Sequence, residues 1–369
     1  MRSARKATVL RESIIILILF TMSVYLYYMV AGWGISEYLA EGVFKDYVTG
    51  PVIYWEILIL SLGFGLLFAV VNALSDAPRV RRLPFGFIIF LKSLLYLVSL
   101  AFVAACGQLV FRLFLFSPAE MDHLMGVMTP RFLISVFLWL AVSILAINFV
   151  MEVSRKVGPG NLSALFTGRY RRPRIEDRIF LFLDLKASTT ITERLGSEKF
   201  SRLLRQCFYD LNDIVITYGA QIYQFVGDEV VLTWLNQDND SPSRSLRVFF
   251  EFEEKLRGRR ALYEKKYGVV PIFRGGIDSG AVTATEVGDI KREIAYHGDP
   301  LNTAARLLEL SKKFQQGLLI SGKIKANISK SSEYRVQHQG DVRLRGKTEK
   351  VAIYTVNHDK LEIFKKRDT

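Results

Sequence analysis

Four apolar stretches restrict what this chain can fold into more than any other feature of its sequence. They lie at residues 13–33, 52–74, 87–115 and 132–151. Each is long enough to cross the roughly 30 Å hydrocarbon core of a bilayer as a helix of about 20 residues. The sequence therefore predicts an α-helical membrane region with four spans over residues 1–152, with the lipid bilayer as its partner.

The composition agrees with a chain that is partly buried in lipid. Half of its 369 residues are hydrophobic, which exceeds what a soluble protein of this length needs. The net charge is +13, and Lys and Arg gather where the apolar stretches end. We therefore expect these basic residues to face a membrane surface and not to bind nucleic acid. Two cysteines, Cys106 and Cys207, are too few for a disulfide framework or a cysteine zinc site.

The distribution of charge between the loops predicts the orientation of the spans. Basic residues precede the first span, separate the second from the third and follow the fourth, whereas the other two loops are mainly acidic. By the positive-inside rule both termini are then cytoplasmic, and we expect a multi-pass protein of the inner (plasma) membrane. The basic residues are Arg2, Arg5, Lys6, Arg11, Arg79, Arg81, Arg82, Arg155, Lys156, Arg169, Arg171, Arg172 and Arg174.

The rest of the chain divides into a linker, a second domain and a tail. Residues 153–177 are basic and contain Gly158, Pro159 and Gly160, which predicts a juxtamembrane linker lying against anionic lipid. Residues 178–357 form the second domain, and residues 358–369 a charged tail.

A continuous apolar run from Arg178 to Asp184 predicts a buried central strand that ends at a carboxylate. Such a strand end suits metal or phosphate chemistry, although the aspartate could instead cap the next helix. One amphipathic helix is then predicted over residues 193–218.

Residues 221–234 read as a hairpin with a tight turn at Gly227 and Asp228. If this hairpin lies beside the first strand, Asp184 and Asp228 face one another. Paired carboxylates are ligands that suit Mg²⁺ or Mn²⁺, and two such ions can support an in-line displacement at phosphorus. The alternative is an ordinary Gly-Asp turn without a metal.

Two further strands are predicted at residues 272–280 and 282–287, followed by a helix that begins near Pro300. Asn302 and Arg306 are four residues apart and therefore share one face of that helix. They are either part of a site or ordinary solvated surface.

Four segments taken together make residues 177–356 resemble the catalytic domain of class III adenylate and guanylate cyclases. Residues 182–189 (Phe-Leu-Asp-Leu-Lys-Ala-Ser-Thr) are similar to the first metal motif of that family, and residues 225–228 to its second-metal hairpin. Residues 302–306 (Asn-Thr-Ala-Ala-Arg) are similar to its Asn-x-Ala-x-Arg helix. Residues 340–347, followed by a strand at 351–356, resemble its closing strands.

The resemblance implies an α+β, ferredoxin-like βαββαβ palm and a head-to-tail homodimer with active sites at the subunit interface. Asp184 and Asp228, with the carbonyl of Leu185, would bind two Mg²⁺ or Mn²⁺ ions per site. The partner subunit would supply Asn302 to orient the ribose and Arg306 to neutralise the α-phosphate. The remaining phosphates would lie against the backbone amides of Lys186, Ala187, Ser188 and Thr189 and against Lys347 or Arg345.

Two purine-facing positions depart from the family pattern. Adenylate cyclases of the family carry Lys where this chain has Gln224, and Asp or Thr where it has Ala295. Guanylate-specific members carry Glu and usually Cys, which are absent here. Gln224 offers both a donor and an acceptor to a purine edge, so it could read adenine. From the assembled motifs and the absence of a guanine-type Glu at this position, we expect conversion of ATP to 3′,5′-cyclic AMP and pyrophosphate for intracellular signalling.

Three alternatives stay open at this point. One is a guanylate cyclase, and another is a degenerate cyclase that binds nucleotide and signals without turnover, which the unusual purine positions would suit. The third is a diguanylate cyclase, whose Gly-Gly-Asp/Glu-Glu-Phe hairpin is partly matched by residues 227–229. A diguanylate cyclase would not need the helix at residues 302–306.

Overall fold

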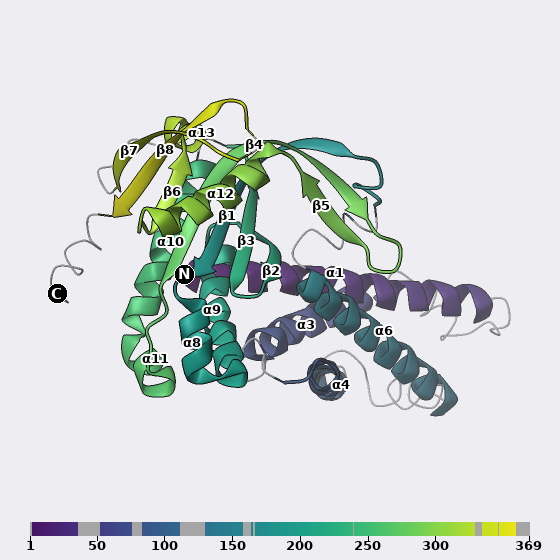
Figure 1. Ribbon diagram of the computed structural model, residues 1–369. Coiled ribbons are helices and arrows are strands. Elements are labelled where there is room, and N and C mark those ends of the chain that lie inside the picture. Colours follow the sequence, from purple (N-terminus) through teal and green to yellow (C-terminus); the bar gives the residue numbers. More distant parts are fainter. Residues whose placement is uncertain are drawn as a thin grey trace. The chain divides into compact units, whose positions relative to one another are not determined.

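The computed structural model describes residues 2–35, 52–75, 83–110, 130–157, 164, 167–238, 240–328, 334–345 and 347–358. The chain divides into two compact units, Arg2–Val157 and Gly158–Thr369 (Figure 1).

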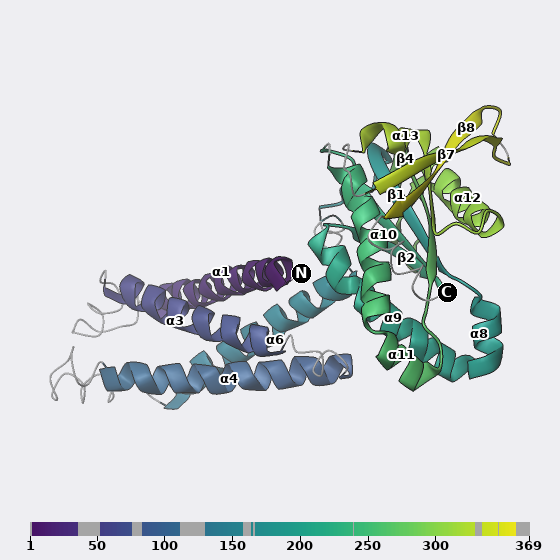
Figure 2. The ribbon, with the colours of Figure 1, turned by 90° about the vertical axis from the view of Figure 1, so that its left-hand side faces the viewer.

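The N-terminal unit contains four long helices, α1 (Arg2–Ile35), α3 (Val52–Ser75), α4 (Phe85–Val110) and α6 (Pro130–Val157). Helix α1 packs against α3 and α6, and α4 packs against the same two helices, so the four form a closed bundle (Figure 2). Aromatic rings fill part of its interior, where Phe68 lies 5.0 Å from Phe20 and 4.4 Å from Tyr96 between ring centroids.

The outer surface of this bundle is apolar. Leu66 is 71% exposed, Met22 64% and Phe102 63%, and similar side chains cover the outside of all four helices. Two helices contain stretches long and apolar enough to cross a membrane, Val9–Val30 and Ile134–Arg155, whereas the described apolar parts of α3 and α4 are shorter. Length and composition therefore support two of the four expected spans. The other two stay predictions, and the end of the third lies outside the described residues.

A polar network ties the four helices together inside the bundle. Lys92 of α4 donates from Nζ to Glu152 Oε1 of α6 at 2.6 Å, and both side chains are buried. Arg155 of α6 donates to Glu152 Oε1 at 3.2 Å, to Glu12 Oε1 of α1 at 3.1 Å and to Asn72 Oδ1 of α3 at 3.1 Å. Because the charges of this network are paired, they can be buried at a tolerable cost.

The C-terminal unit is an eight-stranded mixed sheet covered by helices on both faces. In chain order its elements are β1 (Arg174–Leu185), α8 (Ser188–Leu195), α9 (Ser197–Thr217), β2 (Gln221–Val226), β3 (Glu229–Leu235), α10 (Ser241–Gly258), α11 (Arg260–Tyr267), β4 (Phe273–Val287), β5 (Glu293–His297), α12 (Asp299–Lys313), β6 (Leu318–Ser321), α13 (Gly322–Asn327), β7 (Tyr334–Arg343) and β8 (Lys350–His358).

The order of the strands confirms the predicted palm. They run β2-β3-β1-β4-β6-β8-β7, with β5 paired to β4. The segment β1-α9-β2-β3-α10-β4 is the βαββαβ unit of a ferredoxin-like fold, and β1 lies at its centre, antiparallel to both β3 and β4. The predicted central strand and the predicted hairpin are therefore both present.

Strand β1 is buried on both faces because its side chains alternate between two cores. Leu181 and Leu183 belong to the core that α9 and α10 cover, whereas Phe180 and Phe182 belong to the core under α12. Helix α12 lies directly on β4 at Gly276, where a Cβ atom would be only 2.3 Å from a backbone oxygen of the helix. Glycine at this point therefore fixes how closely α12 approaches the sheet.

Three local predictions were wrong. Residues 273–287 form one continuous strand rather than two, and β5 was not predicted at all. The helix expected over residues 193–218 is two helices, because Gly196 adopts a φ of 74° and breaks it. The first strand begins at Arg174, inside the expected linker, and the expected tail lies outside the described residues apart from its first residue.

Candidate active site

Asp184 lies at the C-terminal end of the central strand. It is the last residue but one of β1, opposite Glu229 of β3 and Arg274 of β4, and it is only 8% exposed. The hydrophobic residues before it are buried within the sheet, so the carboxylate of Asp184 lies at the edge of the hydrophobic core. Burial of a carboxylate here is costly unless a positive charge accompanies it.

Asp228 stands beside Asp184 in the turn between β2 and β3. Gly227 precedes it with a φ of 61°, a conformation that glycine adopts without strain. The two carboxylates lie close together because Asp228 directly precedes Glu229, the cross-strand partner of Asp184. Burial raises the pKa of Asp184, and the neighbouring charge of Asp228 also raises it. Within the described part of the chain, the buried Oδ2 of Asp228 has no hydrogen-bond partner.

A third group, which the sequence reasoning missed, contacts Asp184. Lys312 Nζ lies 2.5 Å from Asp184 Oδ2 and forms an ion pair with it. Lys312 is near the C-terminal end of α12, and no motif or spacing in the sequence signals its contact with β1. Glu229 adds a further carboxyl group, whose pKa is raised by burial and then by the charge of Asp184.

The segment after β1 carries the backbone amides that were predicted to bind phosphate, and the amide of Lys186 already donates to the carbonyl oxygen of Ile272 at 2.8 Å. Ala187 has a φ of 58° in the left-handed region, and the turn that it makes starts helix α8 at Ser188. The first amides of a helix have no partner within it, and they attract anions. Lys186 and Thr189 are exposed, so the predicted phosphate-binding segment is open to solvent.

Asn302 and Arg306 lie in the N-terminal half of α12, the first exposed and the second half-buried. At 1.5 Å per residue, Asn302 is about 15 Å along the helix axis from Lys312, which contacts Asp184. The fold therefore does not bring Asn302 to the carboxylate pair of its own chain.

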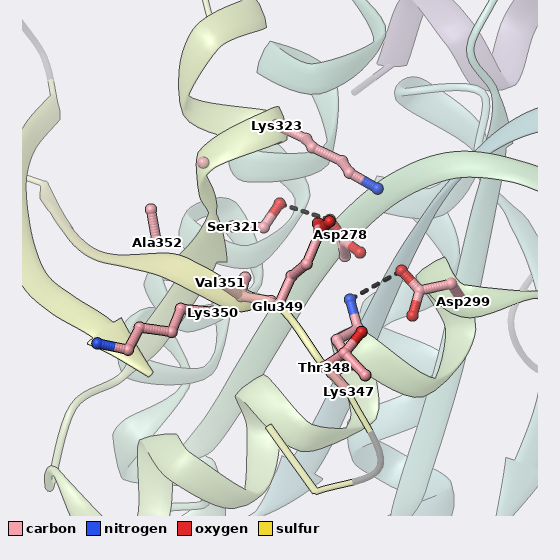
Figure 3. A pocket seen from close by; sticks show the side chains of 11 residues that line it. Asp278, Asp299, Ser321, Lys323, Lys347, Thr348, Glu349, Lys350, Val351 and Ala352 are labelled. Atoms are coloured by element: carbon pink, nitrogen blue, oxygen red, sulfur yellow. Dashed lines mark hydrogen bonds and ion pairs between the residues drawn. The ribbon is translucent and has the colours of Figure 1, made fainter. Parts of the chain in front are cut away.

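Lys347 lines a cavity of about 510 Å³ (Figure 3). Its Nζ donates to Asp299 Oδ2 at 2.8 Å, at the start of α12. The same cavity contains Asp278, which accepts a hydrogen bond of 2.5 Å from Ser321. Arg345, the other predicted phosphate-binding cation, is exposed and is not among the lining residues.

The two predicted purine positions lie on strands that approach one another. Gln224 is exposed on β2, and Ala295 is half-buried on β5. The residues next to them, Tyr223 and Tyr296, contact each other with ring centroids 5.0 Å apart. Arg178 lies over the ring of Tyr296 at 4.5 Å and is 1% exposed, so a buried cation underlies this contact.

The carboxylate pair suits a divalent metal that is completed by a ligand. Among the described residues, no three His, Cys, Asp or Glu side chains are gathered to hold an ion alone. Two features nevertheless fit a cation, the unpartnered oxygen of Asp228 and the ammonium group on Asp184. The carbonyl of Leu185 and the phosphates of a nucleotide would supply further oxygen ligands.

Comparison with known proteins identifies the family. Residues 171–358, half of the chain, match the family model of the adenylate and guanylate cyclase catalytic domain. The chain therefore belongs to this family.

Curated relatives include adenylate cyclases from bacteria. Adenylate cyclase 2 of Rhizobium meliloti (strain 1021) is 33% identical over 210 residues, which is 57% of this chain and 58% of that protein. The adenylate cyclase of Anabaena cylindrica is 24% identical over 179 residues, or 48% of this chain and 36% of the relative. The chain thus spans less than two thirds of these relatives.

Solved structures with a similar C-terminal unit include cyclases of both substrate types. The adenylyl cyclase CyaB from P. aeruginosa is 21% identical with a TM-score of 0.46, covering 51% of this chain and 97% of that one. The guanylate cyclase domain of RhGC from Catenaria anguillulae, in complex with GTP, is 20% identical with a TM-score of 0.43, covering 50% and 98%.

Proposed function

We propose that this protein is a membrane-bound adenylate cyclase that converts ATP to 3′,5′-cyclic AMP and pyrophosphate. The observation that carries the proposal is the pair of Asp184 and Asp228 at the end of the central strand of a cyclase-family domain, where one buried oxygen has no partner among the described residues. Membership of the family supports the reaction class, and the adenylate cyclases among its relatives support ATP as the substrate.

In the proposed reaction the 3′-oxygen of the ribose forms a bond to the α-phosphorus. The bond from that phosphorus to the β-phosphate oxygen breaks, pyrophosphate leaves and the hydroxyl proton passes to solvent. Divalent ions held by Asp184 and Asp228 would lower the pKa of the 3′-hydroxyl group and neutralise the leaving pyrophosphate. Arg306 suits the α-phosphate because its planar guanidinium group matches two phosphate oxygens.

We further propose that each active site is shared between two copies of the chain. The separation of about 15 Å along α12 between Asn302 and the residue that contacts Asp184 supports this arrangement. In a two-fold dimer, Asn302 and Arg306 of each copy reach the carboxylate pair of the partner, and the same contact forms twice.

Gln224 supports ATP over GTP within this proposal. A guanine-reading Glu is absent from this position, and the exposed amide of Gln224 can both donate to and accept from adenine. A competition assay with equal ATP and GTP tests this point, and a preference for GTP would make the protein a guanylate cyclase.

The apolar outer surface of the helical bundle supports a location in a bilayer. Exposed apolar side chains surround an interior that contains a buried polar network, which is an arrangement that lipid stabilises and water does not. We propose four spans with both termini in the cytosol. A reporter enzyme fused to the C-terminus should be active in the cytosol, and activity only on the outer side would reverse the orientation.

The direct test uses the purified full chain in detergent or reconstituted bilayers. We expect incubation with ATP and Mn²⁺ to yield a product with the mass of 3′,5′-cyclic AMP, and an Asp184→Ala variant to yield none. Absence of cyclic product from the folded wild-type protein with either ATP or GTP would refute the proposed activity.

A further inference from the structure

One contact at the candidate metal site has no role in the chemistry described above. Lys312 Nζ lies 2.5 Å from Oδ2 of Asp184, one of the two carboxylate oxygens that could bind a metal ion. The side chain of Lys312 is 50% exposed, whereas that of Asp184 is only 11% exposed. The cation therefore reaches in from solvent to a carboxylate that belongs to the core.

The charge of the site explains why a cation lies there. Asp184, Asp228 and Glu229 bring three carboxyl groups to adjoining positions of β1 and the β2–β3 hairpin. Like charges so close repel one another, and a partly buried carboxylate without a counter-charge is costly. An ammonium group on Asp184 reduces that repulsion, as a divalent ion at the same oxygen would.

We propose that Lys312 is a built-in counter-ion of the metal site, which competes with the divalent ion for Asp184. The inference rests on the proposed function in so far as Asp184 is taken as a metal ligand. An ion of charge +2 attracts the carboxylate pair more strongly than one ammonium group does. The metal therefore displaces Lys312, and the exposed stem of this residue lets it swing into solvent.

The competition sets how much metal the protein needs. While Lys312 holds Asp184, binding of a divalent ion must break this ion pair, so the apparent affinity of the site for metal is lower than its oxygen ligands alone would give. The same ion pair stabilises α12 against β1 when metal is scarce. Lys312 is therefore a positioning residue. It lowers the affinity of the site for a metal ion and stabilises the metal-free protein.

The test replaces Lys312 with Met, which keeps the length of the side chain and the helix propensity but removes the charge. Lys313→Met is the matched control, because it removes the same charge from the next position of the same helix. The purified full chains are titrated with Mn²⁺ alone, and free Mn²⁺ is measured by electron paramagnetic resonance. We expect Lys312→Met to bind Mn²⁺ roughly tenfold more tightly than the wild type and the control, because one partly screened charge contact has been removed.

A second readout follows stability rather than metal binding. Without Mn²⁺, Lys312→Met should unfold at a lower temperature than Lys313→Met, and Mn²⁺ should raise its unfolding temperature by more, because a tighter ligand stabilises the folded state more. In an Asp184→Asn background, Lys312→Met should no longer change the affinity for Mn²⁺. Lys312→Gln repeats the test if the Met variant fails to fold.

Equal affinities for Mn²⁺ in Lys312→Met and Lys313→Met would overturn the inference, as would the same gain in the Asp184→Asn background. Failure of the proposed function looks different, because the wild-type protein would then form no cyclic product whatever its affinity for Mn²⁺. Normal cyclase activity with unchanged metal affinity in Lys312→Met would refute the role of Lys312 and leave the proposed function standing.

Discussion

Two inactive variants should restore activity when they are produced together. Asp184→Ala removes a carboxylate of the metal site, and Arg306→Ala removes the cation proposed for the α-phosphate. Arg306 and Lys312 are six residues apart on α12, about 9 Å along its axis. In the proposed dimer, Arg306 therefore acts at the carboxylate pair of the partner, and the two lesions lie on opposite sides of the shared site. In a mixed dimer one composite site carries both lesions and the other carries neither.

The expected recovery follows from random pairing. At equal expression about half of the dimers are mixed, and each mixed dimer has one intact site of two, so activity should return to about a quarter of the wild-type value if the sites act independently. Helices that confine both copies to one membrane should assist pairing by raising their effective concentration. The assay is cyclic AMP formation by co-expressed, differently tagged and co-purified chains.

The matched control is a pair of lesions on the same side of the site. Asp184→Ala produced together with Asp228→Ala leaves no intact site in any dimer, because every carboxylate pair is then damaged. We therefore expect no recovery from this pair. If the complementary pair co-purifies in equal amounts and is no more active than the control pair, the shared-site proposal is wrong.

Three further outcomes are expected. Asp228→Asn should reduce cyclic AMP formation at least a hundredfold, because the amide removes a negative charge from the proposed metal site; near-normal rates would exclude Asp228 as a ligand. Gly276→Ala should destabilise the C-terminal unit by about 1–3 kcal/mol, because its Cβ would lie 2.3 Å from a backbone oxygen of α12. Chemical denaturation measures this, with Gly258→Ala, where nothing lies within 4 Å, as the neutral control. Lys92→Met should destabilise the helical bundle by about 3 kcal/mol, since it leaves the buried Glu152 without its closest partner; an unchanged melting temperature in detergent would show that Arg155 neutralises this carboxylate alone.

Much of the catalytic unit could be predicted from short segments. The apolar run before Asp184 specifies a buried strand, and a glycine before Asp228 specifies a tight turn, because both are decided by neighbouring residues. The spacing of Asn302 and Arg306 places them on one helical face for the same reason. These local signals placed Asp184 at the end of a strand and Asp228 in the turn of a hairpin, and the structure pairs that hairpin with β1.

Pairing over long distances decided what could not be predicted. Strand β5 is five residues long and exists because it pairs with β4, and its own sequence, Glu-Ile-Ala-Tyr-His, gives little indication of a strand. The continuity of β4 past Gly280 likewise follows from its pairing with β1 along twelve positions. A strand owes its stability to its neighbours, so a single-sequence pattern cannot fix its ends.

By itself, then, the sequence determined the apolar helices, the central strand that ends at Asp184 and the hairpin that carries Asp228 in its turn, since all of these depend on residues close together in the chain. Only the tertiary structure decided that Lys312 reaches Asp184, a contact across 128 positions in the sequence, and that Glu12, Asn72, Lys92, Glu152 and Arg155 form one network inside the bundle. Charged side chains carry no local signal of their partner, because a long flexible lysine or arginine serves equally well on a solvated surface. Their partners are set by how the helices and the sheet pack.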